Sequence, residues 1–100
     1  MARPSALDTE AIQAALRDLD GWELRDGKLH RELRFADFAA AFGFMAAVAT
    51  VAAEMDHHPE WSNVYSRVTV DLVTHDAGGV TELDLQMARR MSELARGATA

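Results

Sequence analysis

The chain has 100 residues, of which 49% are hydrophobic, and it carries a formal net charge of −6 at pH 7. This length accommodates one domain, residues 1–100, and the acidic surface, with no basic cluster longer than Arg89-Arg90, argues against direct binding of nucleic acid. The absence of cysteine excludes disulfides, thiolate zinc sites and cysteine nucleophiles. Residues 1–5 lack the apolar run of a secretory signal, so we expect a cytoplasmic location.

The first third of the chain predicts a helix followed by a β-hairpin. Over residues 5–19 apolar side chains recur at helical spacing, namely at Ile12, Leu16 and Leu19. Asp20-Gly21 ends this pattern. Two extended runs, residues 22–25 and 28–34, then flank Asp26-Gly27, a dipeptide typical of tight hairpin turns. We therefore predict two antiparallel strands here.

The Ala-rich segment 35–56 is predicted to be the longest helix. Its uncharged stretch, residues 38–53, falls short of the roughly 20 strongly apolar residues that a bilayer requires, so we expect a buried helix and no membrane span. Its apolar residues form two stripes, the first of Phe38, Phe42, Met45, Ala49 and Ala52 and the second of Phe44, Val48, Val51 and Met55. One stripe suffices to cover a sheet, so the second predicts a neighbouring helix, a subunit interface or both.

The last third of the chain predicts two more strands and a helix. Residues 63–74 alternate in polarity, with Val64, Val68, Val70 and Leu72 sharing one parity. Twelve residues are long for one strand, so we predict a tight turn near Ser66 that divides the run. Thr81 and Asp84 match a capping box, and the helix that they begin has an apolar stripe of Leu83, Met87, Met91 and Leu94.

The predicted order of elements is α-β-β-α-β-β-α. Strands joined by tight turns are antiparallel, and amphipathic helices cover the apolar face of a sheet. We therefore predict an α+β two-layer sandwich in which a four-stranded antiparallel sheet has its helices packed on one face. A domain of this size gains stability from further burial, which favours self-association.

Three histidines lie where predicted elements end: His57 and His58 after the long helix and His75 after the last strand. Loop ends on a rigid scaffold are common places for chemistry, and Pro59 disfavours helical backbone at His58, so the two adjacent rings should diverge. A metal site is disfavoured, because ligands on one helix face are spaced by four residues and only Glu54 and His58 meet that spacing. Surface histidines without function remain the plain alternative.

Four segments carry a resemblance to a known family: Asp56-His57-His58-Pro59-Glu60-Trp61, Val64-Tyr65, Thr74-His75-Asp76 and Thr81-Glu82-Leu83-Asp84. Together they closely resemble the signature of pterin-4a-carbinolamine dehydratases, in which an acidic residue, three spacers, His-His-Pro and an aromatic are followed later by His and Asp. We assign Glu54 to the acidic opening. Gly21-Trp22 and the long helix are also similar to the N-terminal half of the family, so the resemblance spans nearly the whole chain.

The resemblance implies a cofactor-free and metal-free hydro-lyase that dehydrates 4a-hydroxytetrahydropterin to quinonoid dihydropterin and so supports tetrahydrobiopterin recycling. Two proton transfers are needed, and histidine can perform either at neutral pH. By similarity, His57 and His75 are the candidates for these transfers and His58 for positioning the substrate. The substrate-binding residues implied are His57, His58, Pro59, Trp61, Thr74, His75 and Asp76, with Glu54 and Asp84 in supporting roles.

The partners implied by the resemblance are a pterin substrate, further copies of the chain in a homodimer or homotetramer, and an aromatic amino acid hydroxylase in the same pathway. A non-catalytic alternative is a pterin-binding or coactivator-like module that contacts a protein partner through the second stripe of the long helix. Retention of the three histidines favours the enzyme.

Overall fold

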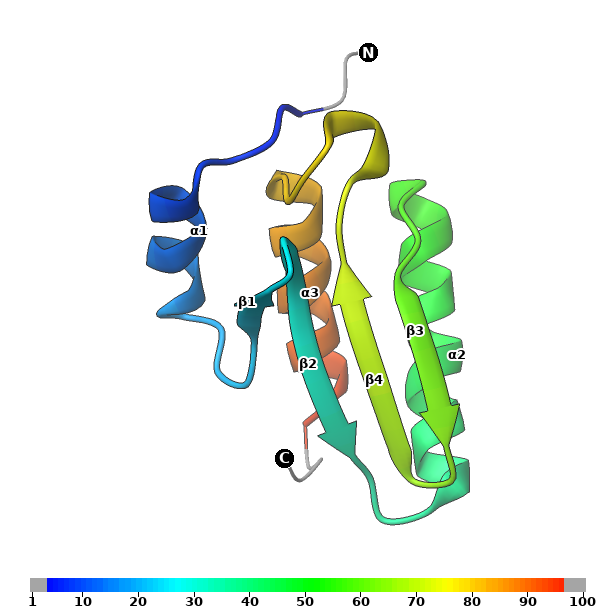
Figure 1. The fold of residues 1–100 in the computed structure, drawn as a ribbon. Helices are drawn as coiled ribbons and strands as arrows, with labels where there is room; N and C mark the ends of the chain where they lie inside the picture. The colour runs from blue at the N-terminus through cyan, green and yellow to red at the C-terminus, as the bar shows by residue number, and fades with distance from the viewer. Residues whose placement is uncertain (1–3, 97–100) are drawn as a thin grey trace.

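The computed structural model describes residues 4–96, which form an antiparallel sheet, three α-helices and a short 3-10 helix (Figure 1). The helices are α1 (Thr9–Leu16), α2 (Phe38–Met55), η1 (His75–Ala77) and α3 (Glu82–Leu94). The strands are β1 (Glu23–Arg25), β2 (Lys28–Arg34), β3 (Glu60–Val64) and β4 (Arg67–Leu72).

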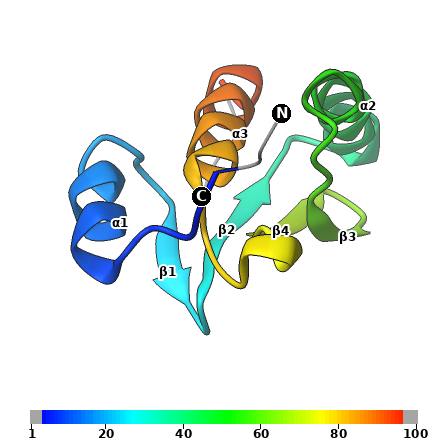
Figure 2. The same cartoon turned by 90° about the horizontal axis from the view of Figure 1, so that it is seen from above.

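All strand pairs are antiparallel, and the order across the sheet is β1-β2-β4-β3. The three α-helices lie on one face of this sheet, and within residues 4–96 no α-helix covers the opposite face, called here the open face (Figure 2). The predicted α+β two-layer sandwich is therefore confirmed. Its core is closed by residues on alternate positions of the central strands, among them Leu29 and Leu33 of β2 and Val68, Val70 and Leu72 of β4.

The first helix begins later than the predicted residue 5, because the preceding segment pairs with another part of the chain. The Leu7 amide donates to the Val80 carbonyl at 2.8 Å, and Asp8 then caps the helix by accepting from the Ala11 amide at 2.8 Å. The helix also ends earlier than predicted, at Leu16, although Leu19 in the following turn is still buried in the core.

The second hairpin is where the predicted strand boundaries are wrong. The chain does turn at Tyr65-Ser66, as predicted, but β3 starts at Glu60, three residues before the predicted run. Val64 pairs with Arg67 and is 61% exposed, whereas Val68 is fully buried. The prediction that Val64 shares a face with Val68 is wrong, because it assumes that side chains keep alternating through the two-residue turn. Residues paired across such a turn lie on the same face, so Val64 lies on the face of Arg67.

The longest helix, α2, buries one of its two apolar stripes. Its buried residues are Ala41, Phe44, Val48, Val51 and Ala52, while Phe38 and Phe42 are 49% and 57% exposed. The expected burial therefore holds for one side of the helix and not for the side that carries Phe38 and Phe42. With 18 residues and a mean hydropathy of 1.7, α2 is long and apolar enough to cross a bilayer, and 28% of it is buried. Length alone does not exclude a membrane span, but its buried stripe packs against β4 and α3 as in a core helix.

The last helix buries Met87 and Met91 of the predicted stripe, but not the two leucines at its ends. Leu83 is only partly buried and Leu94 is 38% exposed, while the buried residues are Asp84, Leu85, Met87, Ala88 and Met91. Asp84 is also buried, at the first turn of the helix. This buried carboxylate leads directly to the candidate site.

Candidate active site

The three histidines of the loops come together at one edge of the sandwich, which we call the histidine edge. The chain leaves α2, enters β3, leaves β4 and starts α3 at this same end of the molecule (Figure 1). His57 and His58 lie on the first of these connections and His75 begins η1 on the second. The sandwich topology thus gathers residues that are 17 or 18 positions apart in the sequence.

His57 is turned into the protein by the way α2 ends. Asp56 adopts the left-handed conformation, with φ of 50°, and the His57 amide then donates to the Ala52 carbonyl at 3.1 Å. This termination directs the imidazole inward, where only 5% of the residue is exposed. Its Nε2 lies 2.5 Å from Oδ1 of Asp84, a residue of α3 that is completely buried.

Asp84 is held by a chain of hydrogen bonds in addition to His57. Its Oδ2 accepts from the Thr81 amide at 2.9 Å and from the Thr74 hydroxyl at 2.8 Å. Because that hydroxyl has one hydrogen, the 2.7 Å contact between the two threonine hydroxyls has Thr81 donating to Thr74. Both oxygens of the Asp84 carboxylate accept hydrogen bonds when Nε2 of His57 carries a hydrogen and donates it to Oδ1. Asp84 therefore both completes the predicted capping box and orients His57.

His58 and Pro59 follow in a different environment. His58 is exposed, and Pro59, partly buried, directs the chain into β3. The two adjacent imidazoles therefore diverge as predicted, one into the protein and one toward solvent. A substrate at this edge can be contacted from the solvent side by His58 without disturbing the buried His57 pair.

His75 is the most accessible histidine of the edge, with a side chain that is 76% exposed, and it too is paired with a carboxylate. Its Nε2 lies 2.5 Å from Oε2 of Glu60, and the other oxygen, Oε1, accepts from the Lys28 ammonium at 2.6 Å. The hydrogen bond from Lys28, followed by that from His75, lowers the pKa of Glu60 below its ordinary value of 4.5. The same bond raises the pKa of Lys28 above 10.5.

The remaining predicted site residues lie around this edge in several environments. Thr74 is buried in the Asp84 network, and Trp61 is half-buried and packs against the core. Asp76 is exposed on η1 and lines a hollow of about 330 Å³ with Pro4, Ser5, Ala6 and Ala77. Glu54 is exposed on the last turn of α2, and no hydrogen bond or ion pair joins it to the histidines within residues 4–96.

The assignment of Glu54 to the acidic opening of the family pattern is wrong by one position. Three spacers before His57 lead to Ala53, so this chain has a small apolar residue where the pattern has an acidic one. Among the described residues, no three histidine or carboxylate side chains gather as a metal ion would require. Asp84 contacts His57, and Glu60 contacts His75.

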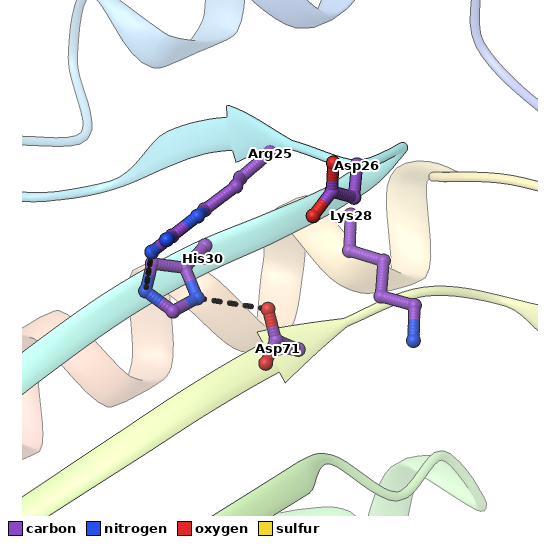
Figure 3. Close-up of a pocket in the computed structure, with 5 residues that line it drawn as sticks. All are labelled: Arg25, Asp26, Lys28, His30 and Asp71. Atoms are coloured by element: carbon purple, nitrogen blue, oxygen red, sulfur yellow. Dashed lines mark hydrogen bonds and ion pairs between the residues drawn. The ribbon is translucent and has the colours of Figure 1, made fainter.

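A second hollow, of about 340 Å³, lies on the open face (Figure 3). It is lined by Arg25, Asp26, Lys28, His30 and Asp71. Arg25 can only donate, so it donates to Nε2 of His30 at 3.1 Å, and Nδ1 of the ring must donate to Asp71 at 2.9 Å. In the sheet register His30 pairs with Asp71, which pairs with Glu60, so one row of polar side chains crosses the open face to the histidine edge.

The fold and this edge define a small α+β domain with histidine-carboxylate pairs suited to acid-base chemistry. Comparison with known proteins makes the assignment specific. The model of the family described as pterin 4 alpha carbinolamine dehydratase matches residues 5–94, so the chain belongs to this family of hydro-lyases.

Similar proteins cover nearly the whole chain. A relative from Solibacter usitatus is 55% identical over 91% of this chain and 96% of its own length, and it carries the name pterin-4-alpha-carbinolamine dehydratase as a provisional assignment. A relative from Brucella ovis with the same name is 52% identical over 95% of this chain and 99% of its own length. A crystal structure from Brucella melitensis, described as a transcriptional coactivator/pterin dehydratase, superposes with a TM-score of 0.88 at 50% identity, covering 91% and 99% of the two chains.

Two residues of the site were missed by reading the sequence. Glu60 was part of the quoted His-His-Pro segment but received no role, and its position directly after Pro59 was the available signal. Lys28 gave no signal, because only the sheet register brings it to a residue 32 positions away.

Proposed function

We propose that this protein catalyses the dehydration of 4a-hydroxytetrahydropterin to quinonoid dihydropterin and water by histidine acid-base catalysis. The observation that carries the proposal is the histidine edge, in which two of the three imidazoles are held by carboxylates and two are open to solvent. Family membership supplies the substrate class.

The reaction needs one group that protonates the departing hydroxyl at carbon 4a and another that accepts a proton from the neighbouring ring nitrogen. Each group must reach the substrate and then exchange its proton with solvent. His58 and His75 are exposed, whereas His57 is buried with Nε2 against Asp84. This geometry favours His58 and His75 as the proton-transferring pair.

His57 then takes the role of a fixed group that shapes the pocket, so the roles expected for His57 and His58 from the sequence are exchanged in this proposal. Asp84 and Thr74 position His57 from within the protein. Backbone groups of the segments 57–59 and 74–76 are suited to contact the polar edge of the pterin, because both segments lie at the same end of the sheet.

The test follows the ultraviolet absorbance of quinonoid dihydropterin after mixing the protein with freshly generated 4a-hydroxytetrahydropterin. We expect acceleration over the uncatalysed rate that survives chelator and falls by on the order of 10²-fold or more in His58→Ala and in His75→Ala. His30→Ala, which alters a histidine outside the edge, is the matched control and should retain activity. A wild-type rate equal to the uncatalysed baseline would refute the dehydratase proposal.

A second role is suggested by the exposed stripe of α2. Phe38 and Phe42 are about half exposed, with ring centroids 5.8 Å apart, and the Brucella melitensis protein is described as a coactivator as well as a dehydratase. We propose that this stripe mediates assembly into a homodimer or homotetramer. Sedimentation of wild type against Phe38→Ser/Phe42→Ser tests it: an unchanged mass would reject this surface, and capture of a different protein would favour the coactivator-like module.

The biological setting proposed for this activity is tetrahydrobiopterin recycling in the cytoplasm beside an aromatic amino acid hydroxylase. The support is the reaction type alone, since a hydroxylated tetrahydropterin must be supplied by an oxygenating enzyme. Restoration of hydroxylase turnover by adding this protein to a coupled assay is the corresponding measurement.

A further inference from the structure

Lys28, Glu60 and His75 form a connected row between the open face and the histidine edge. The Lys28 ammonium donates to Oε1 of Glu60 at 2.6 Å, and Oε2 of the same carboxylate lies 2.5 Å from Nε2 of His75. Each carboxylate oxygen therefore has its own partner. The Glu60 carboxylate is held from two sides and cannot rotate without losing one of them.

The sheet register explains how Lys28 reaches this row. Lys28 begins β2 immediately after the Asp26-Gly27 turn, and it faces the same side of the sheet as His30, two residues later. Glu60 begins β3 and lies in the row of His30 and Asp71. Because β4 separates β2 from β3, the long Lys28 side chain must cross from one strand to the other, and Figure 3 shows it extending from the start of β2 toward the chain that leaves β4.

We propose that Lys28 and Glu60 are positioning residues that fix the orientation and tautomer of His75 for proton transfer. This inference rests on the proposed function, since it concerns the histidine that exchanges a proton with the pterin. Lys28 lies outside the segments that carry the family resemblance, and Glu60 lies inside one of them but has no role in the pattern of acidic, His-His-Pro, aromatic, His and Asp positions.

The chemistry follows from the donors and acceptors. Glu60 is ionised at neutral pH, because the ordinary pKa of a glutamate is already well below 7 and the hydrogen bond from the Lys28 ammonium lowers it further. An ionised carboxylate only accepts, so Nε2 of His75 must carry the hydrogen and donate to Oε2. The lone pair of the neutral ring is then on Nδ1, which becomes the atom that exchanges a proton with the substrate.

The contacts of Glu60 with Lys28 and His75 orient the His75 ring and contribute little to the stability of the fold. The side chains of Lys28, Glu60 and His75 are 35%, 40% and 76% exposed, and ion pairs at such positions add little to stability because water screens them. A bound pterin that displaces water from the histidine edge would strengthen the hydrogen bond between Glu60 and His75 during proton transfer. The expected signature is therefore kinetic and spectroscopic.

The experiment compares Glu60→Ala, Lys28→Met and Lys28→Arg with wild type in the dehydration assay. We expect kcat to fall by on the order of tenfold in the first two variants with KM unchanged, because a positioning residue acts on the pterin only through His75. Lys28→Arg retains a cation that can donate to Oε1 and should restore most of kcat. Unchanged kcat in Glu60→Ala, a loss expressed in KM alone, or failure of Lys28→Arg to improve on Lys28→Met would each overturn the proposal.

Matched controls are available at the far end of β2 on the same face. Glu32 and Arg34 form an exposed ion pair at 3.6 Å, so Glu32→Ala and Arg34→Met remove comparable charges away from the histidine edge. Both should retain wild-type kcat. A similar loss in these controls would show a general effect of surface charge and would overturn the assignment to Lys28 and Glu60.

The ring nitrogens of His75 provide a readout that does not depend on activity. In ¹⁵N spectra of the neutral ring, wild type should show a protonated Nε2 and an unprotonated Nδ1, and Glu60→Ala should bring the two shifts closer as both tautomers become populated. An identical spectrum in the variant would overturn the inference. A wild type that is inactive yet shows the fixed tautomer would instead refute the proposed function, so the two failures are distinguishable.

Discussion

His57 and His75 each place Nε2 at 2.5 Å from a carboxylate oxygen, yet the two pairs lie in opposite environments. Asp84 is completely buried, and its oxygens accept hydrogen bonds from the Thr81 amide, the Thr74 hydroxyl and the His57 imidazole. Glu60 lies at the protein surface between a lysine and a histidine that are open to water. The same chemical pair therefore performs two different tasks at one edge.

The difference between the pairs follows from the solvent around them. In a low-dielectric interior, an unpaired carboxylate is costly and its partners cannot be replaced by water, so the Asp84 pair is part of the fold. At the surface, water competes for both partners, so the Glu60 pair orients the side chains and contributes little to stability. The buried pair should control stability, and the exposed pair should control the protonation geometry of His75.

The largest expected effect is that of Asp84→Asn, which removes the charge and one acceptor from the buried network. We expect a loss of roughly 3 kcal/mol in the free energy of unfolding, as for other disrupted buried pairs. Urea unfolding measures it. The control is Glu82→Gln in the same helical turn, where the exposed pair with Arg89 at 3.2 Å should contribute at most about 0.5 kcal/mol. Equal losses in the two variants would contradict the distinction between the environments.

Thr74→Val should have the next largest effect, because it keeps the shape of the side chain and removes the hydroxyl that donates to Asp84. A buried hydrogen bond to a charged group predicts a loss of about 1.5–3 kcal/mol in the free energy of unfolding, and we expect the lower end since other partners remain. Thr69→Val, on the open face of β4, is the control. Full stability of Thr74→Val would show that the hydroxyl chain does not hold Asp84.

A smaller and purely electrostatic effect is predicted at Glu60. Carbon-13 NMR should give the Glu60 carboxyl a pKa below 4.5, and Lys28→Met should move that pKa back toward 4.5, because the ammonium is the largest cause of the shift. Raising the salt concentration should act in the same direction. A pKa of Glu60 that does not respond to Lys28→Met would mean that the two side chains are not paired in solution.

The smallest effect concerns stability against pH. Since the folded pKa of Glu60 is lowered, its pair contributes above the unfolded value of 4.5 and is lost as the pH falls through the folded pKa. The difference in unfolding free energy between wild type and Glu60→Gln should therefore be small at pH 7 and vanish in acid. Denaturant titrations from pH 3 to pH 7 measure it, and a difference that grows on acidification would have the wrong sign.

The histidine edge could be predicted from the sequence only in part. His57, His58 and His75 were identified because they sit beside element ends and within a signature, and Asp84 because it matches a capping box. No local pattern indicated that His57 would be buried and His58 exposed. The different burial of the two histidines depends on the left-handed backbone conformation of Asp56. An aspartate at this position does not by itself predict that conformation.

The element order, the antiparallel hairpins and the α+β class were determined by the sequence itself, because periodicity, turn residues and caps act over a few neighbouring positions. Only the tertiary structure decided which stripe of α2 was buried, where β3 began, and that Glu60 meets both Lys28 and His75. The burial of α2 depends on how the helix packs against β4 and α3. The contacts of Glu60 depend on the register between strands that are distant in sequence. A one-residue shift in that register would move Glu60 or Lys28 to the opposite face of the sheet, and local patterns do not specify it.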